Sequence, residues 1–195
     1  MLDREPRQVL VVSGSEKGSN YLASALPSPV FEVYGSVNGV AEAKRKLDTG
    51  DCDVVVVNTP LKDEFGADFA IRLAEEASYG VILIVKNEVY DPICYKAEGS
   101  GTIVLSKPLP GGALVQAVHI AAAVHDRLAR AEKKTESILK RMEEIRIVNH
   151  AKWILISKLG MDEESAHRFI EKQAMDLRQT RTEVSQFLIR TYENQ

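Results

Sequence analysis

The stretch AKWILISKLGMDEESA, residues 151–166, determines how the chain ends. Its apolar residues before Gly160 lie on one face of a helix, and the acidic run Asp162-Glu163-Glu164 comes after this glycine. A glycine commonly ends a helix, and an aspartate with acidic residues behind it commonly begins one. The stretch therefore predicts the end of one helix and the start of another, in a small helical module that contains no catalytic constellation.

Two short amphipathic helices are predicted after Gly160. The first has one side made of Ala166, Phe169, Ile170, Gln173, Ala174 and Leu177. The second opens with Thr180-Arg181-Thr182-Glu183, which matches a capping box, and continues with Val184, Phe187 and Leu188. The helix before Gly160 keeps an apolar face at Val148, Ala151, Leu155 and Leu159. These faces predict a compact three-helix core.

A long helix is predicted upstream, because neither glycine nor proline occurs between Ala113 and Leu159. Its mostly apolar seam recurs at steps of three and four residues through Leu114, Ala117, Ala121, Val124, Leu128, Ala131, Thr135, Ile138, Met142, Ile145 and Asn149. This spacing is typical of the a and d positions of a coiled coil. A helix of about 45 residues is roughly 70 Å long, so we expect its first turns to pack on the preceding domain and the rest to need a partner.

The predicted partner is a second copy of the chain in a parallel homodimer. The expected dimer contacts are Leu128, Ala131, Thr135, Ile138, Met142 and Ile145. The alternative is a return helix within the chain, but residues 166–177 and 184–189 are too short to cover the seam. Asn149 stands at an a position, where it either fixes the register or lies beyond the coil and faces a ligand; both interpretations stay open.

The first 125 residues predict an α/β domain. Short apolar strands are expected at Val9–Val12, Phe31–Tyr34, Asp53–Val57, Val81–Val85 and Thr102–Leu105. Helices are expected at Ser19–Ala25, Val40–Leu47 and Gly66–Glu76. Parallel strands need helical crossovers, and β-branched runs suit strands buried on both faces. The pattern favours a doubly wound, five-stranded parallel sheet.

The carboxyl ends of these strands resemble the receiver domain of response regulators, which has the flavodoxin-like strand order. The lysine of Lys107-Pro108 follows the last strand as in that family. The other positions depart from it: Ser13-Gly14 stands where receivers have an acidic pair, Asn58 where they have the phosphoacceptor aspartate, and Lys86 where they have threonine or serine.

These departures predict a receiver-like domain that is neither phosphorylated nor loaded with a metal. An amide has no nucleophilicity comparable to that of a carboxylate, and Mg²⁺ requires hard anionic oxygens that Ser13 and Gly14 do not supply. Lys86 either places its ammonium where the metal would lie, close to Asn58, or points to solvent. The nearby carboxylates do not have the receiver spacing; they are Glu16, Asp63 and Glu64.

Residues 135–191 resemble the ANTAR domain, a transcription-antitermination module. The matching residues come in order: Ala151-Lys152 with Ile154-Leu155, then Leu159-Gly160 with the acidic cap and Ala166, then Gln173-Ala174-Met175-Asp176, then the capped helix with Val184. The chain departs from the family at Trp153, where a small residue is usual, at Ile156, where methionine is usual, and at His167, where an aromatic ring is common. Ile145, with Arg146 beside it, replaces a frequent arginine.

The ANTAR resemblance implies binding to small-loop hairpins in nascent mRNA, favouring an antiterminator over a terminator. By its matching positions it implies RNA contacts at Ala151, Lys152, Arg168, Lys172, Gln173, Arg178 and Arg181. Lys152 is the first choice, and Ala151 would permit close approach. Trp153 is expected in the core rather than stacked on a base, whereas His167 is either a stacking ring or a surface residue.

Composition is consistent with this interpretation. Residues 1–126 carry a formal charge of −6 and residues 127–195 a charge of +3, which permits nucleic-acid contact only in the second part. Cys52 and Cys94 are isolated, so we expect reduced thiols rather than a disulfide or zinc site. The charged start and short apolar runs predict a cytoplasmic protein without a membrane segment.

The predicted organisation is a receiver-like domain at residues 1–125, a coiled-coil linker at 126–147 and an ANTAR domain at 135–195. We interpret the chain as a non-enzymatic antitermination regulator without a cofactor. The alternative is a DNA-binding response regulator, although Glu171, Lys172 and Asp176 make the exposed face of the first short helix after Gly160 too mixed in charge for a major-groove reader. Control by a sequestering protein, by a small ligand in the degenerate pocket or by expression level alone stays open.

Overall fold

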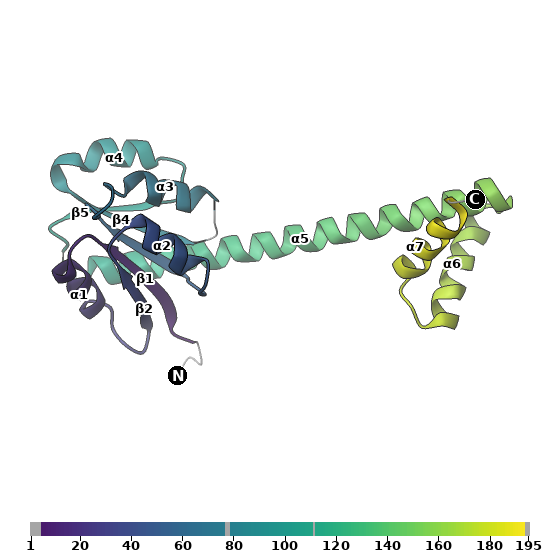
Figure 1. Ribbon diagram of the computed structural model, residues 1–195, viewed down its shortest axis with the longest axis horizontal. Coiled ribbons are helices and arrows are strands. Elements are labelled where there is room, and N and C mark those ends of the chain that lie inside the picture. The colour runs from purple at the N-terminus through teal and green to yellow at the C-terminus, as the bar shows by residue number, and fades with distance from the viewer. Residues whose placement is uncertain (1–4, 77–78, 111, 194–195) are drawn as a thin grey trace. The chain divides into compact units, whose positions relative to one another are not determined.

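The computed structural model describes residues 5–76, 79–110 and 112–193. The chain divides into two compact units, one ending at Arg130 and the other beginning at Ala131. This division falls inside a single helix, α5, which runs from Ala113 to Leu159. The predicted uninterrupted helix is therefore present, and it belongs to both units (Figure 1).

The first unit is built on a parallel sheet. Its strands are β1 (Arg7–Ser13), β2 (Phe31–Val37), β3 (Val54–Asn58), β4 (Gly80–Lys86) and β5 (Ile103–Lys107). They lie in the order β2-β1-β3-β4-β5, with every neighbouring pair parallel. The five predicted strands and the doubly wound topology are thus confirmed. The order also brings the ends of β1, β3 and β4 together at one edge.

Helices cover both faces of this sheet (Figure 1). They are α1 (Glu16–Ser24), α2 (Val40–Leu47), α3 (Ala67–Glu76), the short 3₁₀ helix η1 (Asn87–Val89), α4 (Tyr90–Ala97) and the first turns of α5. Leu22 of α1 and Val118 of α5 pack on one face, while Ala43 of α2 and Ala70 of α3 pack on the other. Most residues of the inner strands β1, β3 and β4 are almost completely buried, as the β-branched runs predicted, whereas the edge strands β2 and β5 are mainly half-buried.

The sequence prediction missed helix α4. Pro92 lies in its first turn, where a helix can accept proline because the missing N–H has no intrahelical partner there. All five strands also run further than predicted at their carboxyl ends: β1 continues to Ser13, β2 to Val37, β3 to Asn58, β4 to Lys86 and β5 to Lys107. These residues are polar or only partly buried, so the apolar pattern ends before the hydrogen-bonded ladder does.

The second unit joins the end of α5 to α6 (Glu163–Leu177) and α7 (Arg181–Glu193). Gly160 ends α5 with φ of 66°, a conformation that glycine adopts without strain. Asp162 begins α6 by accepting a hydrogen bond from the Ser165 N–H at 2.7 Å. The Thr180 N–H donates to the Glu183 carboxylate at 2.7 Å, and the Glu183 N–H returns a bond to Thr180 Oγ1 at 3.2 Å. Both predicted caps are confirmed.

The three helices enclose a small apolar core. Its buried members are Ala151, Leu155, Ala166, Ile170, Ala174, Val184 and Leu188. The prediction is wrong for three residues of these apolar faces: Leu159, Leu177 and Phe187 are exposed instead of buried. Leu159 and Leu177 are the last residues of their helices, beyond the reach of the neighbouring helix. In α7, Val184, Ser185 and Leu188 point inward, which leaves Phe187 at the rim.

Within the described residues, no helix combines the length and the hydropathy that a membrane crossing requires.

Candidate nucleic-acid interface

A groove of about 730 Å³ opens in the second unit, between α5 and the beginning of α7. Its lining residues are Lys140, Arg141, Glu144, Ile145, Val148, Asn149, Lys152, His167, Thr180, Arg181, Thr182, Glu183 and Gln186. Four of them are lysines or arginines and two are acidic. The capping box at the start of α7 forms one wall, so the local turn that begins this helix also shapes the groove.

The charges in the groove favour an anionic ligand. The carboxylate of Glu183 accepts hydrogen bonds from the N–H and the hydroxyl of Thr180. These hydrogen bonds lower the pKa of the Glu183 carboxyl below its ordinary value. Arg181 Nη1 and His167 Nε2 lie 3.2 and 3.3 Å from the same oxygen of Glu171. Lysine and arginine side chains commonly position a nucleic acid through its phosphates, so the groove is chemically suited to a phosphate backbone.

Lys152 is held at the side of this groove. Its side chain is 17% exposed, and its Nζ lies 3.2 Å from Glu163 Oε1 in the first turn of α6. The amides of Asn149 and Gln186 line the same groove. Amide side chains both donate and accept hydrogen bonds, so the groove combines cations with groups that can bond to a base edge.

The carboxyl edge of the sheet in the first unit is closed instead. Asn58 Nδ2 donates to Ser13 Oγ at 2.8 Å, and Lys107 Nζ donates to the main-chain oxygen of Thr59 at 2.6 Å. A Cβ atom at Gly14 would lie 2.4 Å from the carbonyl oxygen of Pro60. Burial, and then the neighbouring Lys86, lower the pKa of Lys107. Lys86 itself is exposed, which fits its solvent-facing alternative.

The carboxylate of Asp63 has a structural partner near this edge. It accepts hydrogen bonds from the main-chain N–H groups of Val40 and Ala41 at 3.0 and 3.2 Å, and these bonds lower the pKa of its carboxyl. Asp63 therefore caps helix α2 from a distant loop. The close approach requires Gly39, whose Cβ would lie 2.7 Å from the carboxylate. Of the three nearby carboxylates named from the sequence, Glu16, Asp63 and Glu64, the carboxylate of Asp63 is thus committed to this helix.

Comparison with known proteins resolves the class of the second unit. Residues 136–189 match the family model of the ANTAR domain. The second unit is an ANTAR domain. The chain is 24% identical over 186 residues to the transcriptional regulatory protein PdtaR of Mycobacterium tuberculosis, covering 95% of this chain and 91% of that protein. It is also 27% identical to the aliphatic amidase regulator of Pseudomonas aeruginosa over 86 residues, which are 44% of each protein.

Solved structures share the fold of the first unit. One is the signal receiver domain of an HD domain-containing protein from Pseudomonas fluorescens, with a TM-score of 0.57 and 19% identity over 67% of this chain and 96% of that one. Another is described as an adenylate cyclase from Rhodopirellula baltica, with a TM-score of 0.59 and 18% identity over 67% and 98% of the two chains. At this identity the likeness shows the fold alone, which is that of a receiver.

The predicted RNA contacts divide into two groups in the ANTAR domain. Lys152 and Arg181 line the groove. Four others lie along α6 or at its end, outside the groove lining; they are Arg168, Lys172, Gln173 and Arg178. Arg168 forms an ion pair with Glu164 one turn away. The structure does not bring these four residues to the groove.

Two of the predictions for residues 151–153 are wrong. Ala151 is completely buried in the core of the ANTAR domain, so it permits close packing of α6 rather than close approach of RNA. Trp153 was expected in the core but is 63% exposed. The helical turn explains both, because Ala151 and Leu155 point inward and Trp153 therefore points to the opposite side of α5.

Sequence reasoning missed Lys140, Arg141 and Gln186 as groove residues. A usable signal was present for one of them: Arg141, Ile145, Val148 and Lys152 recur at i, i+4, i+7 and i+11 and therefore share one stripe of α5. Gln186 comes from α7, and only the packing of the three helices reveals its position.

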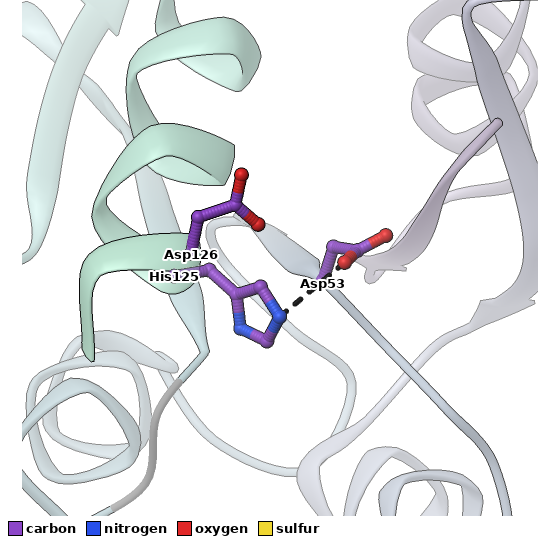
Figure 2. Close-up of side chains that lie close together, drawn as sticks. All are labelled: Asp53, His125 and Asp126. Atoms are coloured by element: carbon purple, nitrogen blue, oxygen red, sulfur yellow. Dashed lines mark ion pairs between the residues drawn. The ribbon is translucent and has the colours of Figure 1, made fainter. Parts of the chain in front are cut away.

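A second cluster lies where α5 packs against the start of the sheet. Figure 2 shows Asp53, His125 and Asp126, whose potential ligand atoms lie within 4.8 Å of one another. Arg7 Nη1 and Nη2 donate to both oxygens of Asp126 at 2.8 and 2.6 Å, and Nη1 also lies 3.2 Å from Asp53. His125 Nε2 lies 3.3 Å from the same Asp53 oxygen.

This cluster is an ion-pair network rather than a metal centre. The other oxygen of Asp53 accepts a hydrogen bond from the Gln8 N–H at 2.7 Å, and a metal would have to displace the guanidinium of Arg7. The hydrogen bond from Arg7 lowers the pKa of Asp126. The network fastens α5 to β1 and to the residue before β3. No local sequence pattern indicates this network, because its members come from three separate segments.

Proposed function

We propose that this protein is a transcription antitermination regulator that binds hairpins in nascent mRNA through its ANTAR domain. It acts as a homodimer, and its receiver-like domain is not phosphorylated. The observation that carries the proposal is the groove that Lys152 lines together with three more lysines and arginines and with the amides of Asn149 and Gln186. The ANTAR family match and the two regulators to which the chain is similar support the same function.

RNA fits this groove better than duplex DNA does. Sequence-specific RNA recognition uses unpaired loop bases, which need a recess for a base beside cations for its phosphates. The groove offers both. A major-groove reader would instead project the exposed side of a helix, and α6 exposes Glu163, Glu164 and Asp176 along with its basic residues.

The proposed dimer follows from the exposed seam of α5. Met142 is 61% exposed and Ile145 is 52% exposed, and Leu128 and Ile138 are exposed as well. Apolar side chains at coiled-coil spacing lose contact with water when a second helix covers them, which contributes roughly 25 cal/mol for each Å² buried. A second copy supplies a helix with the same spacing and the same length.

The proposed lack of phosphorylation rests on the closed edge of the sheet. Asn58 has no carboxylate to accept a phosphoryl group, and its amide is bonded to Ser13. Ser13 and Gly14 bring no charge for a magnesium ion.

A binding competition tests this function. The probe is the tightest-binding hairpin from a pool of short RNA stems with randomised loops, and the competitor is duplex DNA of the same length. We expect the hairpin to bind and the duplex to compete weakly. Arg181→Gln should weaken the hairpin complex, whereas Lys172→Gln removes an exposed cation outside the groove and should change little. Tighter binding of the duplex would favour the DNA-binding alternative.

Sedimentation of the full chain tests the dimer. The wild-type protein should sediment as a dimer, and Met142→Asp should shift it to a monomer because a carboxylate is then placed in the apolar seam. Glu143→Asp, one residue away and off the seam, is the matched control. A monomeric wild-type protein would remove the dimer from the proposal.

A further inference from the structure

We propose that Trp153 of one subunit completes the RNA groove of the other subunit. This inference rests on the proposed dimer and on RNA binding in the groove. Trp153 is the only tryptophan of the chain, and most of its side chain is exposed. Its indole lies near His150, with ring centroids 6.4 Å apart, on the side of α5 away from the buried Ala151 and Leu155.

The seam of α5 runs further than residue 149. With Asn149 at an a position, the a positions are Leu128, Thr135, Met142, Asn149 and Ile156, and the d positions are Ala131, Ile138, Ile145, Lys152 and Leu159. Ile156 and Leu159 are both exposed. Because α5 is unbroken to Leu159, these two residues carry the same seam past the groove to the end of the helix.

This register places Val148 at a g position and Trp153 at an e position. In a parallel two-stranded coil, a g side chain of one helix lies beside the e side chain of the following heptad on the other helix. Val148 therefore faces the partner's Trp153. Val148 packs partly against the ANTAR core and also lines the groove, next to Asn149 and Lys152. The partner's indole consequently reaches the edge of the groove.

The same register gathers positive charge at this edge. Arg141 occupies the preceding g position and lines the groove, so the partner's Arg146 lies beside it. Two positive charges side by side repel each other. The pairing of Arg146 with Glu143 of its own chain, at 3.1 Å, offsets only part of this repulsion. An RNA phosphate would relieve the repulsion between these arginines. The polar members of the seam, Asn149 and Lys152, fall at the same level of the helix.

An indole at this edge would serve as a stacking surface for an unpaired loop base. Stacking of a base on an aromatic side chain typically changes affinity by roughly tenfold or more. The stacked base would lie next to the Asn149 amide and the Lys152 ammonium, which can bond to its edge or its phosphate. Each groove would then take its cations from one subunit and its stacking ring from the other.

Homodimers of point variants give the first test, with the selected RNA hairpin as the probe. Trp153→Ala should weaken hairpin binding about tenfold, and Trp153→Phe should restore most of the affinity. Phe187→Ala is the matched control, because Phe187 is 66% exposed on α7 and lies outside the groove lining; it should bind normally. Sedimentation must show that each variant is still a dimer.

Mixed dimers then separate contributions from the same subunit and from the partner. One subunit carries Arg181→Ala with Gln186→Ala, two groove residues on α7 away from the seam, and the other carries Trp153→Ala. If the tryptophan acts across the dimer, the second subunit keeps its own groove residues and receives an intact indole from the first. One groove per mixed dimer should then bind the hairpin with wild-type affinity, at half the wild-type stoichiometry.

Three results would overturn the inference. Normal binding by Trp153→Ala would show that the indole takes no part. Binding by the mixed dimer no tighter than that of the Trp153→Ala homodimer would place the indole in its own subunit's groove. A wild-type protein that is monomeric or binds no hairpin would overturn the proposed function as well. Failure of the proposed function is therefore seen in the wild type, whereas failure of the tryptophan inference alone is seen only in the variants.

Discussion

The carboxyl edge of the receiver-like sheet and the groove of the ANTAR domain are both lined by polar side chains, but they differ in accessibility and in charge. The edge is closed by the Asn58–Ser13 hydrogen bond, and beside Gly14 the carbonyl oxygen of Pro60 leaves no room for a Cβ atom. The groove is open and cationic. The difference shows that a fold and a site are specified separately, because a site depends on a few side chains and the fold on many.

The largest expected effect concerns the closed edge. Gly14→Ala should lower the free energy of unfolding by about 3 kcal/mol, because the new Cβ would meet the main-chain oxygen of Pro60 at 2.4 Å. Gly18→Ala is the comparison, since its Cβ would meet side-chain atoms of Ser13, Asn58 and Ser15 at 2.6, 2.7 and 2.9 Å, which can shift where a main-chain oxygen cannot. We expect Gly18→Ala to cost about 1 kcal/mol, the contribution of the Asn58–Ser13 hydrogen bond that it displaces. Urea unfolding of the full chain measures the stability of both variants. Equal losses of stability would contradict a clash between position 14 and the main chain.

The open groove should respond through binding rather than stability. Lys152→Ala should weaken hairpin binding by roughly 1–3 kcal/mol if the ammonium bonds to a base edge, or should reduce the salt dependence by about one unit if it contacts a phosphate. Titrations at several salt concentrations distinguish the two outcomes. Lys158→Ala, near the end of the same helix and outside the groove lining, is the control. Unchanged affinity and slope would remove Lys152 from the interface.

A smaller effect is expected from Asn58→Asp. The variant loses the hydrogen bond that the amide donates to Ser13, which contributes about 1 kcal/mol. Neither the wild type nor the variant should gain a phosphate from acetyl phosphate, because Ser13 and Gly14 still provide no metal ligands. Intact mass spectrometry with and without Mg²⁺ checks this. A labile, Mg²⁺-dependent adduct on the wild-type protein would show that the edge is not closed.

The smallest effect should appear in the caps of the ANTAR domain at low pH. Hydrogen bonds from Ser165 lower the pKa of Asp162, and those from Thr180 lower the pKa of Glu183. The stabilisation is complete above the ordinary values of 3.8 and 4.5 and is lost as the pH falls through the lower folded values. Helicity followed by circular dichroism should decline in acid for the wild type. Asp162→Asn should decline less, and an identical pH profile would contradict the capping role.

Local patterns predicted most of the fold. The parallel sheet, the unbroken α5 and the caps at Gly160, Asp162 and Thr180 each depend on neighbours within a few residues, and the structure contains them all. Helix α4 was missed because its apolar pattern is weak and Pro92 interrupts it. Within the ANTAR domain, the predicted three-helix core is present. Leu159, Leu177 and Phe187, which the periodicity placed in this core, are exposed.

The candidate site was predicted only in part, because it is assembled from separate helices. Lys152 and Arg181 were found by resemblance to the family. Gln186 and the orientation of Trp153 depend on how α5, α6 and α7 pack, which no single segment encodes. The network of Arg7, Asp53 and Asp126 in the first unit could not be predicted for the same reason. These charged residues are far apart in sequence, and no local pattern indicates that they form ion pairs.

The tight space at Gly14 also limits how this domain could be redesigned. A Cβ at position 14 would lie 2.4 Å from the carbonyl oxygen of Pro60, so an acidic residue fits there only if the loop carrying Pro60 moves. An engineered magnesium site at this edge would therefore need changes in that loop together with the new carboxylates, and exchanging single residues would not create one.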